Sequence, residues 1–447
     1  MSEKELFSVK QLQFLIIPLI LEQILGVTVG LADSIMVSSA GEAAMSGVAL
    51  VDAINILLVN TFAALATGGA VVAAHRLGEK KEKEAVKTAN QLLFIVVGVA
   101  LVIMLMALVG NRFILRIVYR NLETDVMEKA VIYFYIIALS FPFLGIYNSC
   151  AALCRAMGNS KVTMLVSLVM NIINIAGNAV MIYGLKTGVF GAAVSTLLAR
   201  IVGASIMLAV LVDKQKPIHF DRTEWQGVSR KVIRKICQVG MPIGLDGFIF
   251  QIGKILVQGI VAGLGTAAIS ANSIVGMVGG IATIPASAVG MSMVTVVGQT
   301  IGAGRPEEAK RYVRKLIMAA YMGMAIVNVP LFFFAGKVVG LYSVSQYTAQ
   351  IATEVIIFHS VIAVTLWPLS FALPNAIRAT YDAAFTMVVS VSSMWIFRIG
   401  FSYLFCKIWD MGVMGVWMSM GIDWLFRSIM FVWRVKSGKW LKKVGMA

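Results

Sequence analysis

Long apolar runs alternate with short polar breaks along the whole chain. Each run holds 20 or more residues, enough for a helix to cross about 30 Å of hydrocarbon. Turn signals such as Gly158-Asn159-Ser160 separate the runs. We expect the first run to be a full span rather than a signal peptide. The predicted helices cover residues 11–38, 46–76, 85–110, 128–156, 160–184, 189–213, 235–263, 267–302, 306–336, 348–378, 383–407 and 411–434.

The two halves of the sequence resemble each other at a fixed offset. The segment from Pro18 to Glu22 aligns with that from Pro242 to Asp246, 224 residues later. Further on, Arg155-Ala156 aligns with Arg378-Ala379 at an offset of 223. The fold class we predict is therefore an all-α integral membrane protein, with twelve transmembrane helices in two six-helix lobes related by a parallel internal repeat.

The longest polar stretch divides the two copies. We expect an N-terminal six-helix lobe at residues 1–212, a cytoplasmic connector at 213–234, and a C-terminal six-helix lobe with a short basic tail at 235–447. The basic amphipathic run at 228–236 is typical of a segment that lies on anionic lipid headgroups.

Basic residues are distributed unevenly between alternate loops. Of 38 Lys and Arg residues, 27 lie at the termini and in one set of loops, and seven lie in the opposite set. Because basic residues near helix ends favour the cytoplasmic side, both termini are predicted to be cytoplasmic in a multi-pass protein of the cell membrane.

Composition and motifs exclude several functions. The chain is 59% hydrophobic and 13% charged, against about 25% charge in a soluble domain. The net charge of +16 comes from loops between apolar runs, so we expect no nucleic-acid partner. The sequence has no ATP-binding P-loop, no HExxH and no GxSxG. Four scattered cysteines predict neither a disulfide framework nor a zinc site. We therefore expect a non-enzyme with no catalytic residue, metal or cofactor.

Acidic residues inside the apolar runs are the strongest functional candidates, because a charge within a membrane is costly. Glu22 and Asp33 are three helical turns apart on one helix face. Asp246 repeats Glu22, again four residues after a proline. Such carboxylates can hold a cation or exchange protons. The alternative is that each acid pairs structurally with a basic residue elsewhere.

Polar residues in other helices are weaker candidates. Asn171, Asn174 and Asn178 share a face of the fifth helix, where amides can contact an ion or bond a neighbouring helix. Asp52 lies near a helix start, which favours a dipole interaction. Lys254 can neutralise an acid from another helix or repel cations.

The remaining charged residues within helices are interpreted as structural. We expect Arg200, Arg398 and Arg427 to pair with acids, and Asp423 lies one turn before Arg427. His359 is expected to be hydrogen bonded.

Several segments together resemble the multidrug and toxic compound extrusion (MATE) transporters. They cover nearly the whole chain, and their order and spacing carry the resemblance. They are Pro18 to Ser34, Arg155-Ala-Met-Gly-Asn159, Gly265-Thr-Ala-Ala-Ile269, Val297-Gly-Gln299 before Gly302-Ala-Gly304, and Trp424 to Trp440.

The resemblance implies two six-helix lobes that export organic cations and other drugs in exchange for Na⁺ or H⁺. Asp33 matches the family's acid in the first helix, and Asn174 its asparagine in the fifth. Asn178 stands where several members have aspartate. Asp246 matches a position usually held by glutamate. Leu366 replaces an aspartate that some sodium-driven members use.

We therefore predict an ion-coupled antiporter that works by alternating access. Asp33, helped by Asn174 and Asn178, is the expected coupling site of the first lobe, and Asp246 that of the second. Glu22 is a candidate for either role, and protons are favoured over sodium as the coupling ion. The expected partners are a drug-like or cationic small molecule and membrane lipids, with the protein acting as a monomer.

Two other functions remain open at this point. A flippase for lipid-linked sugars should line its cavity with several cations, whereas the sequence offers mainly acids together with Lys254. The missing nucleophile or metal motif argues against a membrane-embedded enzyme, and the two-lobe duplication argues against a passive channel. Transport with and without an imposed ion gradient separates these functions.

Overall fold

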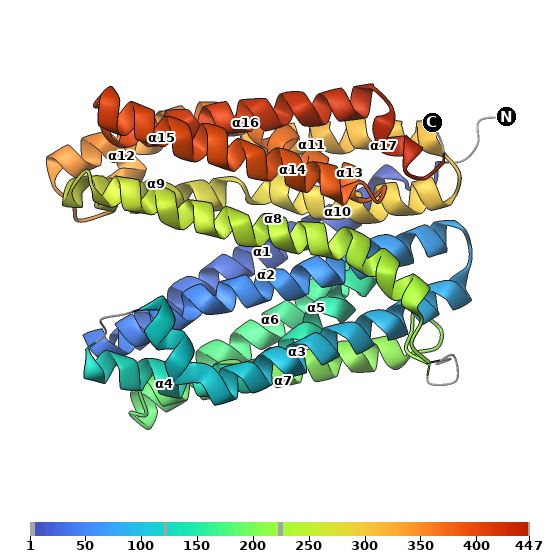
Figure 1. The fold of residues 1–447 in the computed structure, drawn as a ribbon, viewed down its shortest axis with the longest axis horizontal. Helices are drawn as coiled ribbons and strands as arrows, with labels where there is room; N and C mark the ends of the chain where they lie inside the picture. Colours follow the sequence, from blue (N-terminus) through green and yellow to red (C-terminus); the bar gives the residue numbers. More distant parts are fainter. Residues whose placement is uncertain (1–4, 120–122, 222–226, 446–447) are drawn as a thin grey trace. The chain divides into compact units, whose positions relative to one another are not determined.

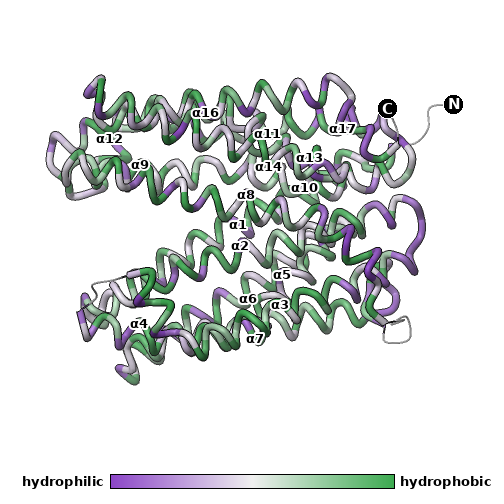
Figure 2. The backbone as a smooth tube through the Cα atoms, viewed as in Figure 1, coloured by the Kyte–Doolittle hydropathy of each residue, from purple (hydrophilic) through white to green (hydrophobic). Residues whose placement is uncertain are grey.

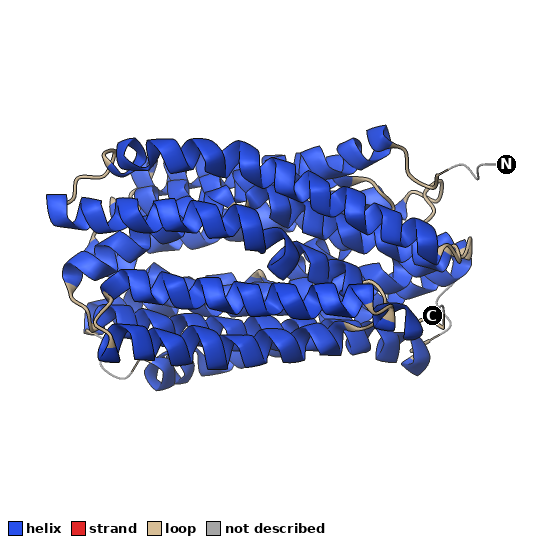
Figure 3. Ribbon diagram, turned by 90° about the horizontal axis from the view of Figure 1, so that it is seen from above, coloured by secondary structure: helices blue, strands red, loops and turns tan. Residues whose placement is uncertain are grey.

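Helices make up almost all of the computed structural model, which describes residues 5–119, 123–221 and 227–445 (Figures 1 and 3). Within these ranges the helices are joined by loops and no strand occurs. The chain divides into two compact units. We call Val9–Gly244 the N-terminal unit, and Leu245–Ala447 together with Met1–Ser8 the C-terminal unit.

The N-terminal unit contains seven α-helices and part of an eighth within its described residues. One π-helical stretch, η1, continues α6. The elements are α1 (Val9–Ser38), α2 (Glu42–Gly78), α3 (Glu82–Val118), α4 (Thr124–Leu139), α5 (Phe141–Ala156), α6 (Ser160–Asn178), η1 (Ala179–Gly184), α7 (Val189–Val212) and the first part of α8 (Arg230–Ala262).

The C-terminal unit repeats this arrangement with more frequent breaks. Three π-helical stretches, η2 to η4, interrupt its helices. Its elements after α8 are α9 (Thr266–Ala282), α10 (Ile284–Gly302), α11 (Pro306–Val339), α12 (Gln346–Trp367), η2 (Pro368–Ala372), α13 (Leu373–Arg378), α14 (Ala383–Ser393), η3 (Met394–Gly400), α15 (Phe401–Tyr403), η4 (Leu404–Ile408), α16 (Gly412–Lys436) and α17 (Lys439–Lys442).

Each of the twelve predicted segments is helical, but two contain a break that was not predicted. The segment expected at 128–156 is two helices, α4 and α5, bent by 48° at Ser140. The segment expected at 267–302 is broken at Thr283 between α9 and α10. In both cases a proline occupies the first turn after the break, where its missing N–H costs no helical hydrogen bond.

The surface of the helices is apolar, as a membrane requires. Among the described residues, ten helices are long and apolar enough to span a membrane, and the bent pair makes eleven. Large side chains such as Val109 and Phe333 are 89% and 73% exposed. Figure 2 shows hydrophobic helix bodies, with hydrophilic residues concentrated toward helix ends and loops. An apolar surface of this extent is stable only in lipid, so the chain is a multi-pass membrane protein.

The predicted connector joins directly to a transmembrane helix. Residues 222–226 lie outside the described part of the chain, and α8 already begins at Arg230. The basic run predicted at 228–236 is therefore continuous with α8 from Arg230 onward. The boundary between the compact units falls at Gly244, inside the same helix.

Packing within each unit brings distant polar residues together. In the N-terminal unit, α6 packs against both α1 and α7, and α4 packs against α2 and α7. In the C-terminal unit, α12 packs against α9 and α16, and both η2 and η3 pack against α16. These contacts surround the two cavities described below.

Candidate functional site

A small polar cavity lies inside the N-terminal unit. Its volume is about 140 Å³, and it is lined by residues of α1, α2, α4, α6 and α7. Its polar side chains include Asp33, Asp52, Tyr133, Asn178 and Thr196. Since five helices contribute, the site depends on the tertiary fold of this unit.

A chain of hydrogen bonds connects the cavity's amides to Asp33. Asn178 Nδ2 donates to Asp33 Oδ1 at 2.5 Å and to Asn174 Oδ1 at 3.4 Å. Asn174 Nδ2 in turn donates to Thr196 Oγ1 at 3.1 Å. The three residues predicted from the sequence are therefore in contact. Their role in coupling stays a prediction.

One acceptor among these hydrogen-bonded side chains has no partner. Asn178 Oδ1 is buried and receives no hydrogen bond within the part of the chain that the structure describes. A buried amide oxygen without a donor is costly, by about 1–3 kcal/mol. A cation, a protonated carboxyl group or a water molecule in the cavity would satisfy it.

Asp52 is a second carboxylate of the same cavity. Tyr133 donates its hydroxyl proton to Asp52 Oδ1 at 3.2 Å. Arg200 attracts both Asp33 and Asp52 electrostatically. Its Nη1 donates to Ser140 Oγ at 2.7 Å, so it also supports the bend between α4 and α5. The cavity thus combines two acids with one more distant positive charge.

Glu22 does not line this cavity, although it shares a helix with Asp33. Its Oε1 lies 3.4 Å from Arg155 Nη1, and its Oε2 accepts from Thr163 Oγ1 at 2.7 Å. These contacts match the structural alternative considered for Glu22, in which an acid pairs with a basic residue.

The C-terminal unit repeats the same cluster around Asp246. Arg378 Nη2 lies 2.8 Å from Asp246 Oδ2, and Arg378 Nε donates to Thr386 Oγ1 at 3.1 Å. Arg378 and Thr386 each lie 223 residues after Arg155 and Thr163. The duplication therefore preserves an acid, arginine and threonine cluster in each unit.

We predict that Asp246 and Arg378 function together as an ion pair. Asp246→Asn should lower the free energy of unfolding by about 1.5–3 kcal/mol and reduce export, because it leaves a largely buried guanidinium without its carboxylate. The double variant with Arg378→Gln should recover part of both losses. Unfolding and export assays on the four proteins of this cycle test it. Strictly additive losses would show that Asp246 acts without Arg378.

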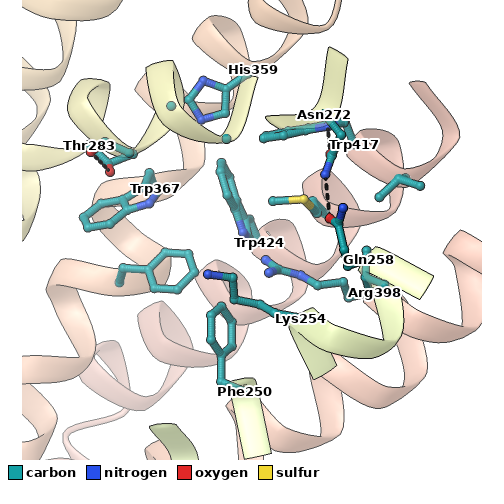
Figure 4. A pocket seen from close by; sticks show the side chains of 17 residues that line it. Phe250, Lys254, Gln258, Asn272, Thr283, His359, Trp367, Arg398, Trp417 and Trp424 are labelled. Carbon is teal, nitrogen blue, oxygen red and sulfur yellow. Dashed lines mark hydrogen bonds between the residues drawn. The ribbon is translucent and has the colours of Figure 1, made fainter. Parts of the chain in front are cut away.

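A larger cavity lies wholly within the C-terminal unit, with a volume of about 360 Å³. Figure 4 shows Lys254 and Arg398 on one side of it and the rings of Trp367, Trp417 and Trp424 around it. Lys254, a candidate from the sequence, thus lies far along the chain from Asp33 and in the other unit.

A polar edge completes this larger cavity. Asn272 Nδ2 donates to Gln258 Oε1 at 3.0 Å, and Trp417 Nε1 donates to Asn272 Oδ1 at 3.1 Å. His359 is buried against the rings of Trp417 and Trp424, at centroid distances of 5.3 and 6.0 Å. The expected hydrogen bond of His359 is not found at Nδ1, which has no partner among the described residues.

The two halves of the chain each match one family model. Residues 18–180 and 242–404 fit the model described as MatE. The chain belongs to the MatE family. The two MatE matches begin 224 residues apart, which is the offset of the internal repeat. The family resemblance and the duplicated helical membrane fold predicted from the sequence are thereby confirmed.

Relatives of this MatE protein match nearly its full length. It is 25% identical to the "Probable multidrug resistance protein NorM" of Thermotoga maritima, over 97% of this chain and 93% of that protein. It is 26% identical to the "Uncharacterized transporter YisQ" of Bacillus subtilis, over 96% and 94%.

Solved structures share the MatE fold. "Crystal structure of MATE in the straight conformation" aligns over 97% of both chains, with a TM-score of 0.91 and 20% identity. A transporter from Pyrococcus furiosus, described by the words "Reverse polarity of binding pocket suggests different function", aligns over 97% and 96% with a TM-score of 0.90 and 20% identity. At this identity the likeness concerns the fold alone.

Sequence reasoning undervalued several residues that line the Asp33 cavity and the cavity at Lys254 of this MatE protein. Asp52 carried a usable signal, because it is an acid in an apolar run like Asp33. Tyr133 and Thr196 carried none, since hydroxyl groups are common in membrane helices. Arg398 was interpreted as a structural partner of an acid, which it is, but it also lines the larger cavity.

Proposed function

We propose that this protein is a secondary active efflux transporter that exports amphipathic small molecules across the cell membrane in exchange for protons. The observation that carries the proposal is the cavity at Asp33, a partly buried carboxyl group that accepts a hydrogen bond from Asn178 and shares the cavity with a second acid, Asp52. The relatives named as multidrug resistance proteins support efflux as the transport direction.

The Asp33 cavity and the cavity at Lys254 differ in size, which supports different tasks for them. The Asp33 cavity, at about 140 Å³, has room for an ion and a few waters, but it is smaller than the roughly 300–1,000 Å³ of small-molecule sites. The larger cavity, at about 360 Å³, lies within that range. In the proposal, the N-terminal unit binds the coupling ion and the C-terminal unit contributes the substrate site.

The chemistry of the ion site suits proton exchange. Asp33 and Asp52 line one cavity, where either carboxyl group can accept a proton as an ion and donate it when neutral. Alternating access then requires that the proton be taken up from one side and released to the other. Arg200 counters the charge that remains when Asp33 loses its proton.

Sodium is the second candidate ion, favoured by one observation. The polar atoms around Asp33 are mainly oxygens, the ligands that hard cations prefer, and Asn178 Oδ1 lacks a partner. In the described residues no three Asp, Glu, His or Cys side chains gather as metal ligands.

Reconstituted vesicles test the proposal. Proton and sodium gradients are imposed separately, and the uphill movement of two fluorescent probes is followed, the cation ethidium and the anion 1-pyrenebutyrate. We expect the proton gradient to drive accumulation of at least one probe. Accumulation driven by sodium alone would assign the second candidate, and equal movement without any gradient would indicate a passive channel.

The proposed transport direction requires a defined topology. From the loop charges we predict that both termini face the cytoplasm. A protease site fused after Ala447 should resist external protease in intact cells and be cut after the cells are opened. Cleavage in intact cells would overturn the twelve-helix topology.

A further inference from the structure

The wall of the larger cavity carries positive charge. Lys254 of α8 and Arg398 of η3 line it, and no acidic residue is among its lining residues in the described chain. Lys254 has neither an ion pair nor a hydrogen bond to any described residue. Figure 4 shows both cationic side chains on the same side of the cavity.

Asp423 lies behind this wall and does not neutralise the positive charge of the cavity. Asp423 is completely buried and lies 2.7 Å from Arg398 Nη2 and 2.8 Å from Arg427 Nε. One carboxylate thus serves two guanidinium groups, which leaves one positive charge in this triad. Lys254 adds a second. Arg398 Nε is buried and has no hydrogen-bond acceptor among the described residues.

Aromatic rings form the rest of the wall. Trp367 stacks on Phe371 at a centroid distance of 4.9 Å, and Phe371 meets Trp424 edge to face at 5.8 Å. Trp424 Nε1 is a buried donor without a partner in the described part of the chain. The cavity therefore offers ring surfaces together with unsatisfied N–H donors, and an anion can accept hydrogen bonds from such donors.

The balance of forces in this cavity favours an anion over an organic cation. Aromatic rings attract cations, but that attraction is weaker than the repulsion from two nearby unit charges at the dielectric of a partly buried site. Two guanidinium contacts already occupy the Phe250 ring, from Arg398 at 5.1 Å and Arg427 at 5.6 Å.

We propose that the cavity of the C-terminal unit binds an amphipathic organic anion, with its anionic group between Lys254 and Arg398 and its aromatic part against Trp367 and Trp424. The ligand chemistry is one carboxylate, sulfonate or phosphate joined to a flat apolar body. That this ligand is exported rests on the proposed function, whereas its binding does not.

The test is binding of 1-pyrenebutyrate to the purified full-length protein in a neutral detergent, followed by energy transfer from tryptophan to pyrene. The matched cation is 1-pyrenemethylammonium. We expect the anion to bind at least about tenfold more tightly. Lys254→Gln should weaken anion binding about tenfold, as expected for loss of one charge-assisted contact. Lys254→Arg should retain it.

Controls keep the result specific to the cavity. Lys337→Gln removes a lysine of α11 that does not line the cavity, and should bind the anion as wild type does. Equal or tighter binding of the cation would overturn the proposal. Unchanged anion binding in Lys254→Gln would also overturn it.

A further experiment distinguishes two possible anionic occupants of the cavity, a lipid headgroup and a soluble aromatic anion. Titration with phosphatidylglycerol that displaces pyrenebutyrate identifies a lipid headgroup as an occupant, and failure to displace it identifies a soluble aromatic anion. The measurement uses no ion gradient. Failure of anion binding therefore leaves the Asp33 proposal intact, and loss of gradient-driven export leaves this inference intact.

Discussion

Asp33→Asn should abolish ion-driven export while the protein remains folded. The asparagine keeps the size of the side chain and can still bond to Asn178, but it cannot change its charge. We expect at least about a 100-fold loss of gradient-driven flux, within the range seen when an acid–base group is removed. Downhill exchange of the probe should persist.

The control for this variant is an acid outside the cavity. Glu354 of α12 is exposed and accepts a hydrogen bond from Gln350, so Glu354→Gln should export as wild type does. Both variants should give the wild-type elution profile and unfolding temperature. Gradient-driven export by Asp33→Asn at the wild-type rate would show that another group couples the ion.

Asp423→Ala should cause the largest loss of stability. Removing this carboxylate leaves Arg398 and Arg427, both at most 5% exposed, without their ion-pair partner. Breaking a buried pair in this way typically costs about 3–5 kcal/mol. It also removes the carboxylate acceptor of the Ser393 hydroxyl, which keeps only the main-chain carbonyl of residue 423 as an acceptor. Denaturant-induced unfolding in mixed micelles measures the change.

Two further variants show whether unpaired charge is the cause. Arg398→Met should cost less than Asp423→Ala, because Asp423 keeps its partner Arg427. Glu79→Ala, in a surface cluster with Arg76 and Lys81, should change stability by less than about 1 kcal/mol. Equal losses for Asp423→Ala and Glu79→Ala would contradict the ion-pair account.

The repeating apolar runs predicted the helices well because the bilayer allows few alternatives to them. The bend at Ser140 was missed because hydropathy continues through it, although Pro142 was a visible signal. The grouping of Asp33 with Asn178 was expected from the family resemblance, and the structure places the two side chains in contact. Asp52 carried a signal as an acid in an apolar run, but its position in the same cavity as Asp33 could not be expected, since it depends on how α2 rotates against α1.

The charged residues of the C-terminal unit could be placed even less well from the sequence. Lys254 and Arg398 are separated by 144 positions and nothing in the sequence places them in one cavity. Arg155 and Arg378 were recognised as repeat partners, but their pairing with Glu22 and Asp246 required the packing of the helices. Side-chain convergence between helices is set by helix rotation, which hydropathy does not determine.

The most direct test of ion coupling runs the exchange in reverse. Vesicles with an internal pH dye and no initial pH difference receive a gradient of transported probe across the membrane. Because coupling is reciprocal, movement of the probe out of the wild-type vesicles should carry protons in, and Asp33→Asn vesicles should show none of this acidification. Equal acidification in both, or probe movement without protons in the wild type, would contradict proton coupling through Asp33.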